Sequence, residues 1–285
     1  VFDQYFKYDE EIYEQLVDIR NKINSSKDLV VNSIVLADIE RKITLFHASV
    51  CKKIISNNLT DIDLIGFHGQ TIFHNANQKI SKQLGDANLL SGLLKKKVVY
   101  NFRENDILNG GQGAPLAAIF HQLLVNQNKI ILPVCILNIG GIANITIVSS
   151  KDFNDLKSYD IGPGNCLLDE WTRKNSKKKF DKNGELAKVG KTDETILNQA
   201  IDSYENIKKK DKLSFDIKDF DLNFVRGLSL QNGLSTLTDF TASIIYNSIL
   251  TSVDLSKDTK LNILICGGGR KNLTLVDNIK NKLPT

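Results

Sequence analysis

Apolar residues along this chain switch between helical and strand-like spacing, and the switching predicts alternating α and β elements. The longest helical pattern covers 33–57, where apolar residues recur every three or four positions, as at Ile39, Ile43 and Phe46. Further helices are predicted at 89–94, 115–125, 192–204, 233–253 and 273–279, with another running through Trp171.

Short apolar runs predict strands at 62–67 and 98–102, a strand ending at Asp160, and another at 261–266. Runs at 134–138 and 142–148 flank Gly140–Gly141 and predict a β-hairpin. Strands that end in glycine and feed helices indicate an α/β fold with ligand sites at strand ends. A polar stretch, NQNK, predicts a boundary between a first lobe, 1–131, and a second lobe, 132–285.

Composition narrows the class of protein. The 285 residues are 41% hydrophobic and 25% charged, which is ordinary for a globular protein. A net charge of +4 is too small over this length to favour nucleic acid, and no apolar stretch reaches the roughly 20 residues of a membrane helix. The four cysteines form no CxxC pair, so we expect reduced thiols in the cytoplasm, without disulfides or zinc.

Three glycine-rich corners are candidate phosphate or nucleotide sites, because glycine lets backbone N–H groups approach an anion closely. None has the Walker or dinucleotide-binding pattern, and each alone is a weak signal. The candidate residues are Gly140 and Gly141 in NIGGIAN, Gly162, Gly164 and Asn165 in DIGPGN, and Gly267, Gly268 and Gly269 in CGGGRKN.

Asp160 is the candidate acid, since it directly precedes the Gly-Pro-Gly turn. A carboxylate fixed there is suited to act as a general base toward water or a hydroxyl. The alternative is that it caps the next helix or braces the turn. Asp169 could hold a Mg²⁺-bound water, although a surface or capping role is equally compatible with its position.

Polar side chains in two earlier segments are suited to a sugar. His68, Gln70 and Thr71 in GFHGQT offer donors and acceptors for hydroxyl groups, although an isolated histidine is more often structural. Arg103 in NFRENDI is suited to a carboxylate or phosphate, and its alternative is an ion pair with Glu104 or Asp106.

Taken together, these motifs resemble those of the anhydro-N-acetylmuramic acid kinases. The segments that carry the resemblance, in family order from about residue 33 onward, are GFHGQT, QLGD, NFRENDI, GGQGAPL, LNIGGIANIT, YDIGPGNCLLDEW and CGGGRKN. The resemblance implies a two-lobed actin-like ATPase fold of ribonuclease-H-like halves, with mixed sheets flanked by helices and with ATP and Mg²⁺ bound. No residue is assigned to Mg²⁺.

The implied reaction opens the 1,6-anhydro bridge of 1,6-anhydro-N-acetylmuramic acid and phosphorylates O6, in bacterial peptidoglycan recycling. Asp160 matches the family's catalytic aspartate, and Arg103 with the 68–71 segment matches its substrate side. Gly140–Gly141 matches a phosphate loop and Gly267–Gly269 the nucleoside site. The implied partners are ATP and an anhydrosugar, with no nucleic acid or membrane, and a homodimer is a candidate assembly because family members commonly dimerise.

The chain departs from the family at both ends. Family members open with a segment of the form MSGTSLDG, which is absent before residue 33, and they continue past the CGGG corner. We therefore expect a fragment that does not turn over by itself. Two alternatives stay open: a kinase for another anhydrosugar such as levoglucosan, and a non-catalytic sugar or nucleotide sensor on the same fold.

Overall fold

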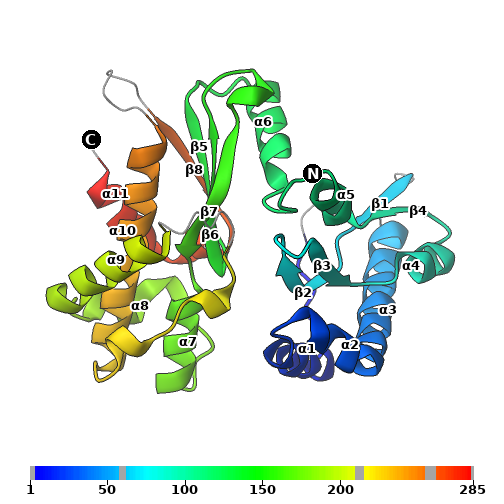
Figure 1. Cartoon of the computed structure of the whole chain (residues 1–285), viewed down its shortest axis with the longest axis horizontal. Coiled ribbons are helices and arrows are strands. Elements are labelled where there is room, and N and C mark those ends of the chain that lie inside the picture. Colours follow the sequence, from blue (N-terminus) through cyan, green and yellow to red (C-terminus); the bar gives the residue numbers. More distant parts are fainter. Residues whose placement is uncertain (1–3, 58–61, 209–214, 254–260, 284–285) are drawn as a thin grey trace. The chain divides into compact units, whose positions relative to one another are not determined.

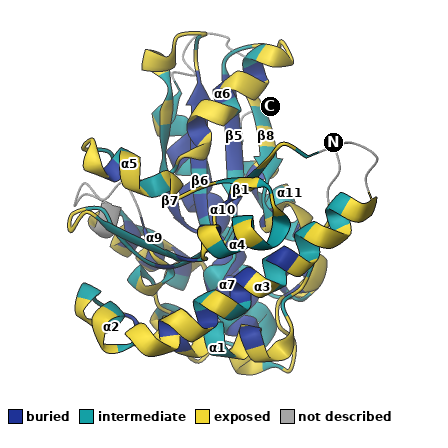
Figure 2. Cartoon of the chain, turned by 90° about the vertical axis from the view of Figure 1, so that its right-hand side faces the viewer, coloured by how far each residue is buried: buried dark blue, intermediate teal, exposed yellow. Residues whose placement is uncertain are grey.

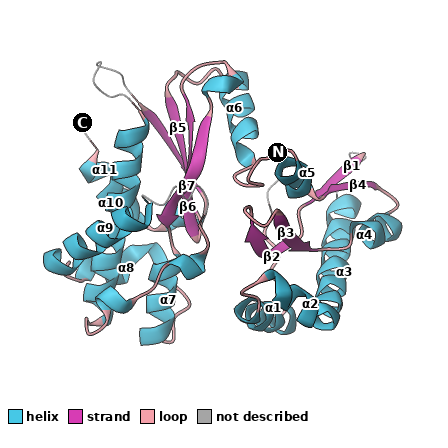
Figure 3. Cartoon of the chain, viewed as in Figure 1, coloured by secondary structure: helices cyan, strands magenta, loops and turns pink. Residues whose placement is uncertain are grey.

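The computed structural model describes residues 4–57, 62–208, 215–253 and 261–283. The chain divides into two compact units, 1–114 and 115–285 (Figure 1). Helices and strands are mixed in both units, which confirms the α/β class predicted from the sequence (Figure 3). None of the helices within the described ranges combines the length and hydropathy needed to cross a bilayer.

In its described residues, the first unit has two small sheets and five α-helices. Its helices are α1 (Glu10–Lys22), α2 (Ser26–Val31), α3 (Ser33–Asn57), α4 (Ala87–Leu94) and α5 (Phe102–Leu108). Its strands are β1 (Leu64–Phe67), β2 (Gln70–Asn75), β3 (Ile80–Leu84) and β4 (Lys97–Tyr100). β1 pairs with β4 in parallel, whereas β2 and β3 form an antiparallel hairpin. Apolar residues of α1 and α3 pack with Ile72 and Leu84 of this hairpin in one core.

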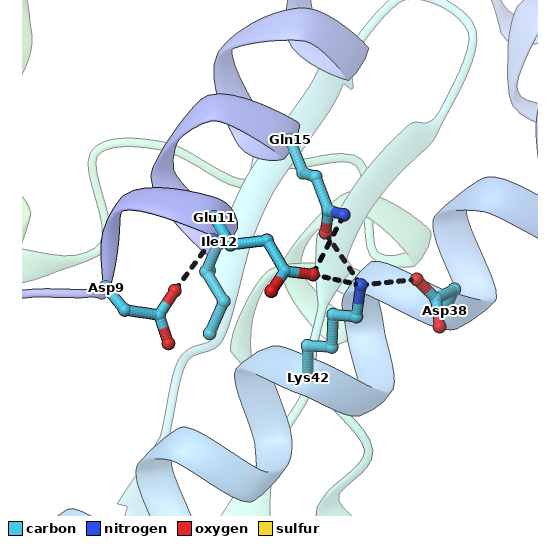
Figure 4. Close-up of polar contacts among 6 residues, drawn as sticks. All are labelled: Asp9, Glu11, Ile12, Gln15, Asp38 and Lys42. Carbon is cyan, nitrogen blue, oxygen red and sulfur yellow. Dashed lines mark hydrogen bonds and ion pairs between the residues drawn. The ribbon is translucent and has the colours of Figure 1, made fainter.

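Polar contacts on the surface also join α1 to α3 (Figure 4). The Lys42 ammonium on α3 lies 2.8 Å from Glu11 Oε1 and 3.0 Å from Asp38 Oδ2, and it donates to Gln15 Oε1 at 3.2 Å. The hydrogen bond to Glu11, followed by the one to Asp38, raises the pKa of Lys42. Such exposed pairs contribute little stability, so the buried isoleucines between the two helices hold them together.

The second unit is built on one four-stranded sheet. Its strands are β5 (Val134–Ile139), β6 (Ile142–Val148), β7 (Lys157–Pro163) and β8 (Asn262–Cys266). Their order is β7-β6-β5-β8, in which β8 is parallel to β5 and the other neighbours are antiparallel. The longer helices are α6 (Ala117–Gln127), α7 (Cys166–Asn175), α8 (Glu185–Val189), α9 (Glu194–Lys208), α10 (Leu230–Ser252) and α11 (Leu273–Lys282).

The two faces of this sheet have different coverings. Alternate residues of β5 and β6, such as Leu137 and Ile145, are fully buried against the helical core that includes α10 (Figure 2). The opposite face meets α6, where Val125 packs with Val134, and the His121 ring contacts the Thr146 hydroxyl at 2.9 Å. Burial lowers the pKa of His121. Both faces are therefore covered along most of the sheet.

Most predicted elements are confirmed, including the helix at 33–57, the 134–148 hairpin and the strand at 261–266. The helices α1, α2, α5 and α8 and the β2–β3 hairpin were not predicted. The lobe boundary at 131/132 stays a prediction. The boundary between the compact units precedes it, at 114/115, because α6 packs on β6 within the second unit.

Candidate active site

One polar residue from each strand forms a row across the sheet of the second unit. Asn144 on β6 pairs with Asp160 on β7 and with Asn138 on β5, and Asn138 pairs in turn with Cys266 on β8. Residues in direct register point to the same face, and the Cys266 thiol indeed donates to Asn138 Oδ1 at 3.7 Å. All four are half-buried. We call these four residues the polar row.

Asp160 occupies a bulged part of β7. The predicted strand end at Asp160 is wrong, because β7 continues through Pro163. The register shifts beside Asn144, so that Ile161 has no opposite residue on β6. A bulge of this kind bends its strand and re-aims the neighbouring side chain. The pairing therefore survives the glycine and proline that were taken to stop it.

The Asp160 carboxylate contacts another segment and not the following helix. Its Oδ2 accepts a hydrogen bond from the backbone N–H of Phe215 at 3.0 Å. The N-cap position of α7 is filled by Asn165, so the alternative in which Asp160 caps this helix is wrong. Asp160 thus combines partial exposure with a fixed hydrogen-bond donor, which is the condition for an oriented base.

The β5–β6 turn and the turn before α7 are bonded to each other. The backbone N–H groups of Gly164 and Cys166 donate to the Gly141 carbonyl at 2.9 and 3.1 Å. Asn165 donates to the Gly140 carbonyl twice, from its backbone N–H at 2.8 Å and from its side-chain amide at 3.0 Å. A Cβ on Gly164 would overlap the Gly140 carbonyl oxygen, so this approach requires glycine.

The third glycine corner meets the same turn. A Cβ on Gly267, which has a φ of 81°, would lie 2.6 Å from the Ile139 carbonyl oxygen. A Cβ on Gly269 would lie 2.7 Å from Ile139 Cβ and 3.1 Å from Asn165 Nδ2. All three corners predicted from the sequence are therefore brought together around the end of β5, beside the polar row.

The glycines at this site differ in what surrounds them. A Cβ on Gly268 would meet no atom of the described residues within 4 Å, and a Cβ on the exposed Gly141 would lie 3.7 Å from the Ile217 side chain. These two positions leave space beside the backbone. A Cβ on Gly162, in contrast, would lie 3.0 Å from the ring of Tyr204. The missing side chain of Gly162 therefore makes room for the Tyr204 ring, whereas Gly141 and Gly268 border open space.

Asp169 lies in the first turn of α7, near these corners in the chain. Burial raises its pKa to about 6, and the nearby Arg173 guanidinium opposes part of that shift. Within the described residues, no three or more His, Cys, Asp and Glu side chains gather closely enough to hold a metal ion. A protein-only metal cage is thus not formed there by the described carboxylates.

The substrate-side candidates of the first unit gather around Arg103 on α5. Arg103 Nη1 donates to the Gly113 carbonyl at 2.7 Å, and its Nε donates to His68 Nε2 at 3.3 Å. His68 Nδ1 lies 2.9 Å from the Gly69 carbonyl oxygen. Because a carbonyl only accepts and a guanidinium only donates, these partners select the His68 tautomer with its hydrogen on Nδ1.

Gln70 and Thr71 begin β2 on the same stretch of chain, and both are half-buried. The Thr71 hydroxyl accepts a hydrogen bond from the Gln83 amide at 3.4 Å, which ties β2 to the QLGD segment. The structure therefore brings His68 and Arg103 into contact, and Gln70 and Thr71 follow His68 within three residues.

Sequence reasoning named Asp106 only as an alternative ion-pair partner of Arg103, and missed that both residues bind Gly113 of the GGQGAPL segment. Asp106 Oδ2 accepts from the Gly113 N–H at 2.6 Å, while Arg103 binds the carbonyl of the same residue. The signal was present in the spacing, since positions 103 and 106 are one helical turn apart. Asn138 and Asn144 were missed as well, although both lie three residues from Gly141, a spacing that could have identified them as cross-strand partners.

Glycine turns that bring backbone N–H groups together at strand ends are typical of α/β proteins that bind phosphate groups. The comparisons with known proteins refine this class. A family model described as "Anhydro-N-acetylmuramic acid kinase" matches residues 3–285. The chain belongs to the anhydro-N-acetylmuramic acid kinase family.

Curated relatives carry the same family name. A protein named "Anhydro-N-acetylmuramic acid kinase" from Pelagibacter ubique (strain HTCC1062) is 64% identical over 284 residues, which cover 100% of this chain and 76% of the relative. Proteins of that name from Methylobacterium nodulans and Rhodospirillum rubrum are 35% and 34% identical, each over 87% of this chain and over 65% and 64% of their own lengths. The chain thus spans about two thirds to three quarters of these relatives.

Proposed function

We propose that this chain carries the core of an ATP-dependent kinase that hydrolyses the 1,6-anhydro bridge of 1,6-anhydro-N-acetylmuramic acid and phosphorylates the resulting O6. The observation that supports it most is the convergence of three glycine corners beside Asp160, in a chain of the anhydro-N-acetylmuramic acid kinase family. The proposed architecture is the two-lobed actin-like ATPase fold with ribonuclease-H-like halves. The product, N-acetylmuramic acid 6-phosphate, belongs to peptidoglycan recycling in the cytoplasm, where ATP is available.

Asp160 is the proposed general base. Its carboxylate takes a proton from a water molecule, whose oxygen forms a bond to the anomeric carbon of the sugar while the C1–O6 bond breaks. The freed O6 then attacks the γ-phosphorus of ATP, and ADP leaves with the electrons of the broken P–O bond. The hydrogen bond from Phe215 holds the carboxylate in one orientation, which is what a base needs in order to act on a positioned water.

The glycine corners are the proposed nucleotide site. Gly141 and Gly268 border open space, and a phosphate needs such room to approach backbone N–H groups. ATP would supply the phosphoryl group, and Mg²⁺ would neutralise charge on its phosphates. Mg²⁺ is usually held by one or two carboxylates plus the phosphates themselves, which agrees with the absence of a larger acidic cluster among the described residues. The half-buried Asp169 is one candidate to orient a Mg²⁺-bound water.

The first unit supplies the proposed sugar contacts. Arg103 would bind the lactyl carboxylate that distinguishes muramic acid from simpler sugars, because a planar guanidinium matches a carboxylate. The guanidinium is already oriented for this role, because it donates hydrogen bonds to the Gly113 carbonyl and to His68. His68, Gln70 and Thr71 would contact sugar hydroxyls. A homodimer is the proposed assembly.

The test uses the gene product that carries this chain, incubated with MgATP and 1,6-anhydro-N-acetylmuramic acid in ¹⁸O-labelled water. The expected sugar product gains both a phosphate and one labelled oxygen, and Asp160→Asn abolishes turnover while sugar binding persists. Turnover with levoglucosan alone would assign the chain to a different anhydrosugar. Nucleotide binding without turnover on either sugar would reject the kinase assignment in favour of a sensor.

A further inference from the structure

Contacts that no sequence motif identified hold Asp160 and the backbone next to it. Its carboxylate accepts from the Phe215 N–H at 3.0 Å. The backbone next to it is held as well, because the Tyr204 hydroxyl on α9 donates to the Ile161 carbonyl. Ile161 is the bulge residue, and a bulge leaves its backbone groups outside the ladder. Tyr204 therefore satisfies a carbonyl that the sheet does not.

Tyr204 is a buried and oriented donor. It is 2% exposed, and its ring packs edge-on against Phe240 of α10 with a centroid distance of 6.1 Å. Burial raises the pKa of Tyr204 above its ordinary value, so the hydroxyl keeps its hydrogen at all physiological pH values. The ring also fills the space beside Gly162, where a Cβ would lie 3.0 Å away. The DIGPGN glycine thus allows Tyr204 to reach the bulge.

The segment 215–225 presents the Phe215 N–H from a packed arrangement. Phe215 is 8% exposed, and its ring lies 5.3 Å from that of Phe220. Phe224 in turn packs against Phe240, the residue that also supports Tyr204. A capping box between Asp216 and Asp219 fixes the backbone that follows Phe215. The donor to Asp160 is therefore preorganised and shares its support with Tyr204.

We propose that Tyr204 and the backbone N–H of Phe215 are positioning groups for Asp160 in the reaction, an inference that rests on the proposed role of Asp160 as the base. Tyr204 holds the bulge that aims the side chain, and the Phe215 N–H fixes Oδ2 and stabilises the charged carboxylate. Misplacement of a base by a fraction of an ångström lowers the rate of the chemical step while the sugar still binds.

Tyr204→Phe tests the backbone contact, with Tyr159→Phe as its matched control. Tyr159 is next to Asp160 in the chain, but its hydroxyl bonds to Ser248 and Ser252 of α10. Each variant removes one hydroxyl that donates to a backbone carbonyl, from a half-buried ring in Tyr159 and from a buried ring in Tyr204. Tyr204→Phe is expected to lower kcat about tenfold or more with KM for the sugar changed less than about twofold, while Tyr159→Phe keeps the kcat of the parent.

The carboxylate contact is tested by replacing Phe215 with 3-phenyllactate, which exchanges only the N–H for an ester oxygen. Loss of a donor to the charged form is expected to move the acidic limb of the kcat–pH profile about one unit upward. The control is the same ester at Phe220, whose N–H donates to the Ile217 carbonyl at 3.4 Å. It should leave the limb in place, because it removes a bond that Asp160 does not share.

Failure of this inference can be told apart from failure of the proposed function. Suppose that Asp160→Asn has no turnover, while Tyr204→Phe and the Phe215 ester keep the parental kcat and an unmoved acidic limb. This outcome would overturn the positioning role and leave the proposed function intact. A kcat loss in Tyr159→Phe equal to that in Tyr204→Phe would also overturn it, since the effect would then be one of general packing. Full activity in Asp160→Asn would remove the base assignment and the positioning role with it.

Discussion

Replacing Gly269 by alanine should disrupt the packing between the glycine corners and lower the free energy of unfolding. The same substitution at the adjacent Gly268 is the control. In Gly269→Ala the new Cβ would lie 2.7 Å from Ile139 Cβ, whereas carbon atoms in contact are normally about 3.5–4.0 Å apart. Ile139 is fully buried and lies in β5, which is paired on both sides, so it cannot move aside. In Gly268→Ala the methyl group meets no atom of the described part of the chain within 4 Å.

The expected cost follows from two contributions. Overpacking a buried site costs about 1–3 kcal/mol. The same Cβ would lie 3.1 Å from Asn165 Nδ2, whose amide donates to the Ile139 and Gly140 carbonyls at 3.2 and 3.0 Å. Losing one of these bonds adds about 1 kcal/mol. We therefore expect the free energy of unfolding of Gly269→Ala to fall by about 2–4 kcal/mol.

Urea unfolding of both variants, followed by circular dichroism, measures this difference, and titration with ADP reports on the site. Gly268→Ala should unfold within about 0.5 kcal/mol of the parent, as a surface substitution without new contacts does. Equal stability losses in the two variants, or no loss in Gly269→Ala, would show that the corner is not packed against β5 as described.

Three further substitutions test other parts of the site. Gly164→Ala should lose about 2 kcal/mol of stability in urea unfolding and bind ADP more weakly, because its methyl group overlaps the Gly140 carbonyl oxygen. Burial raises the pKa of Asp169 to about 6, against an ordinary value of 3.8, so the charged carboxylate destabilises the folded state. This destabilisation is absent below about pH 4 and is fully present above about pH 6. Asp169→Asn should therefore be more stable than the parent at pH 7 by about 1 kcal/mol after allowance for solvent screening, and equal to it at pH 4, in unfolding curves at both pH values. Arg103→Lys should raise KM for the sugar about tenfold with little change in kcat in steady-state assays, because an ammonium lacks the planar pair of donors; an unchanged KM would exclude Arg103 from carboxylate binding.

The elements predicted from the sequence are those whose own residues carry a clear apolar pattern. The helix at 33–57 has a long apolar stripe, and the hairpin at 134–148 combines two apolar runs with a glycine pair, so both were found with nearly the observed bounds. The helix α1 was missed because only Ile12 and Ile19 are buried along it, while its other aliphatic residues, Leu16 and Val17, are half-buried and exposed. The β2–β3 hairpin was missed because its strands are rich in polar and half-buried residues.

The glycines of the candidate site were predicted from the sequence, whereas most contacts between its residues were not. Glycine turns leave a local signature, which is why the three corners could be identified before their convergence was known. The contacts of Asp160 with Phe215 and of Tyr204 with Ile161 join residues 55 and 43 positions apart, and nothing in the local pattern marks such pairs. The end of β7 was misjudged because pairing with β6 overrides the tendency of a Gly-Pro-Gly segment to end a strand.

The polar row restricts how the gene for this protein can change in length. Each of its four residues reaches the shared face only because its strand keeps its register, and side chains alternate between faces with a period of two. Inserting or deleting one codon between the start of β6 and Asn144 would turn Asn144 toward the helical core and an isoleucine or alanine toward the row. Single-residue insertions and deletions should therefore be tolerated in the loops of this unit outside the glycine corners and eliminated by selection within its four strands.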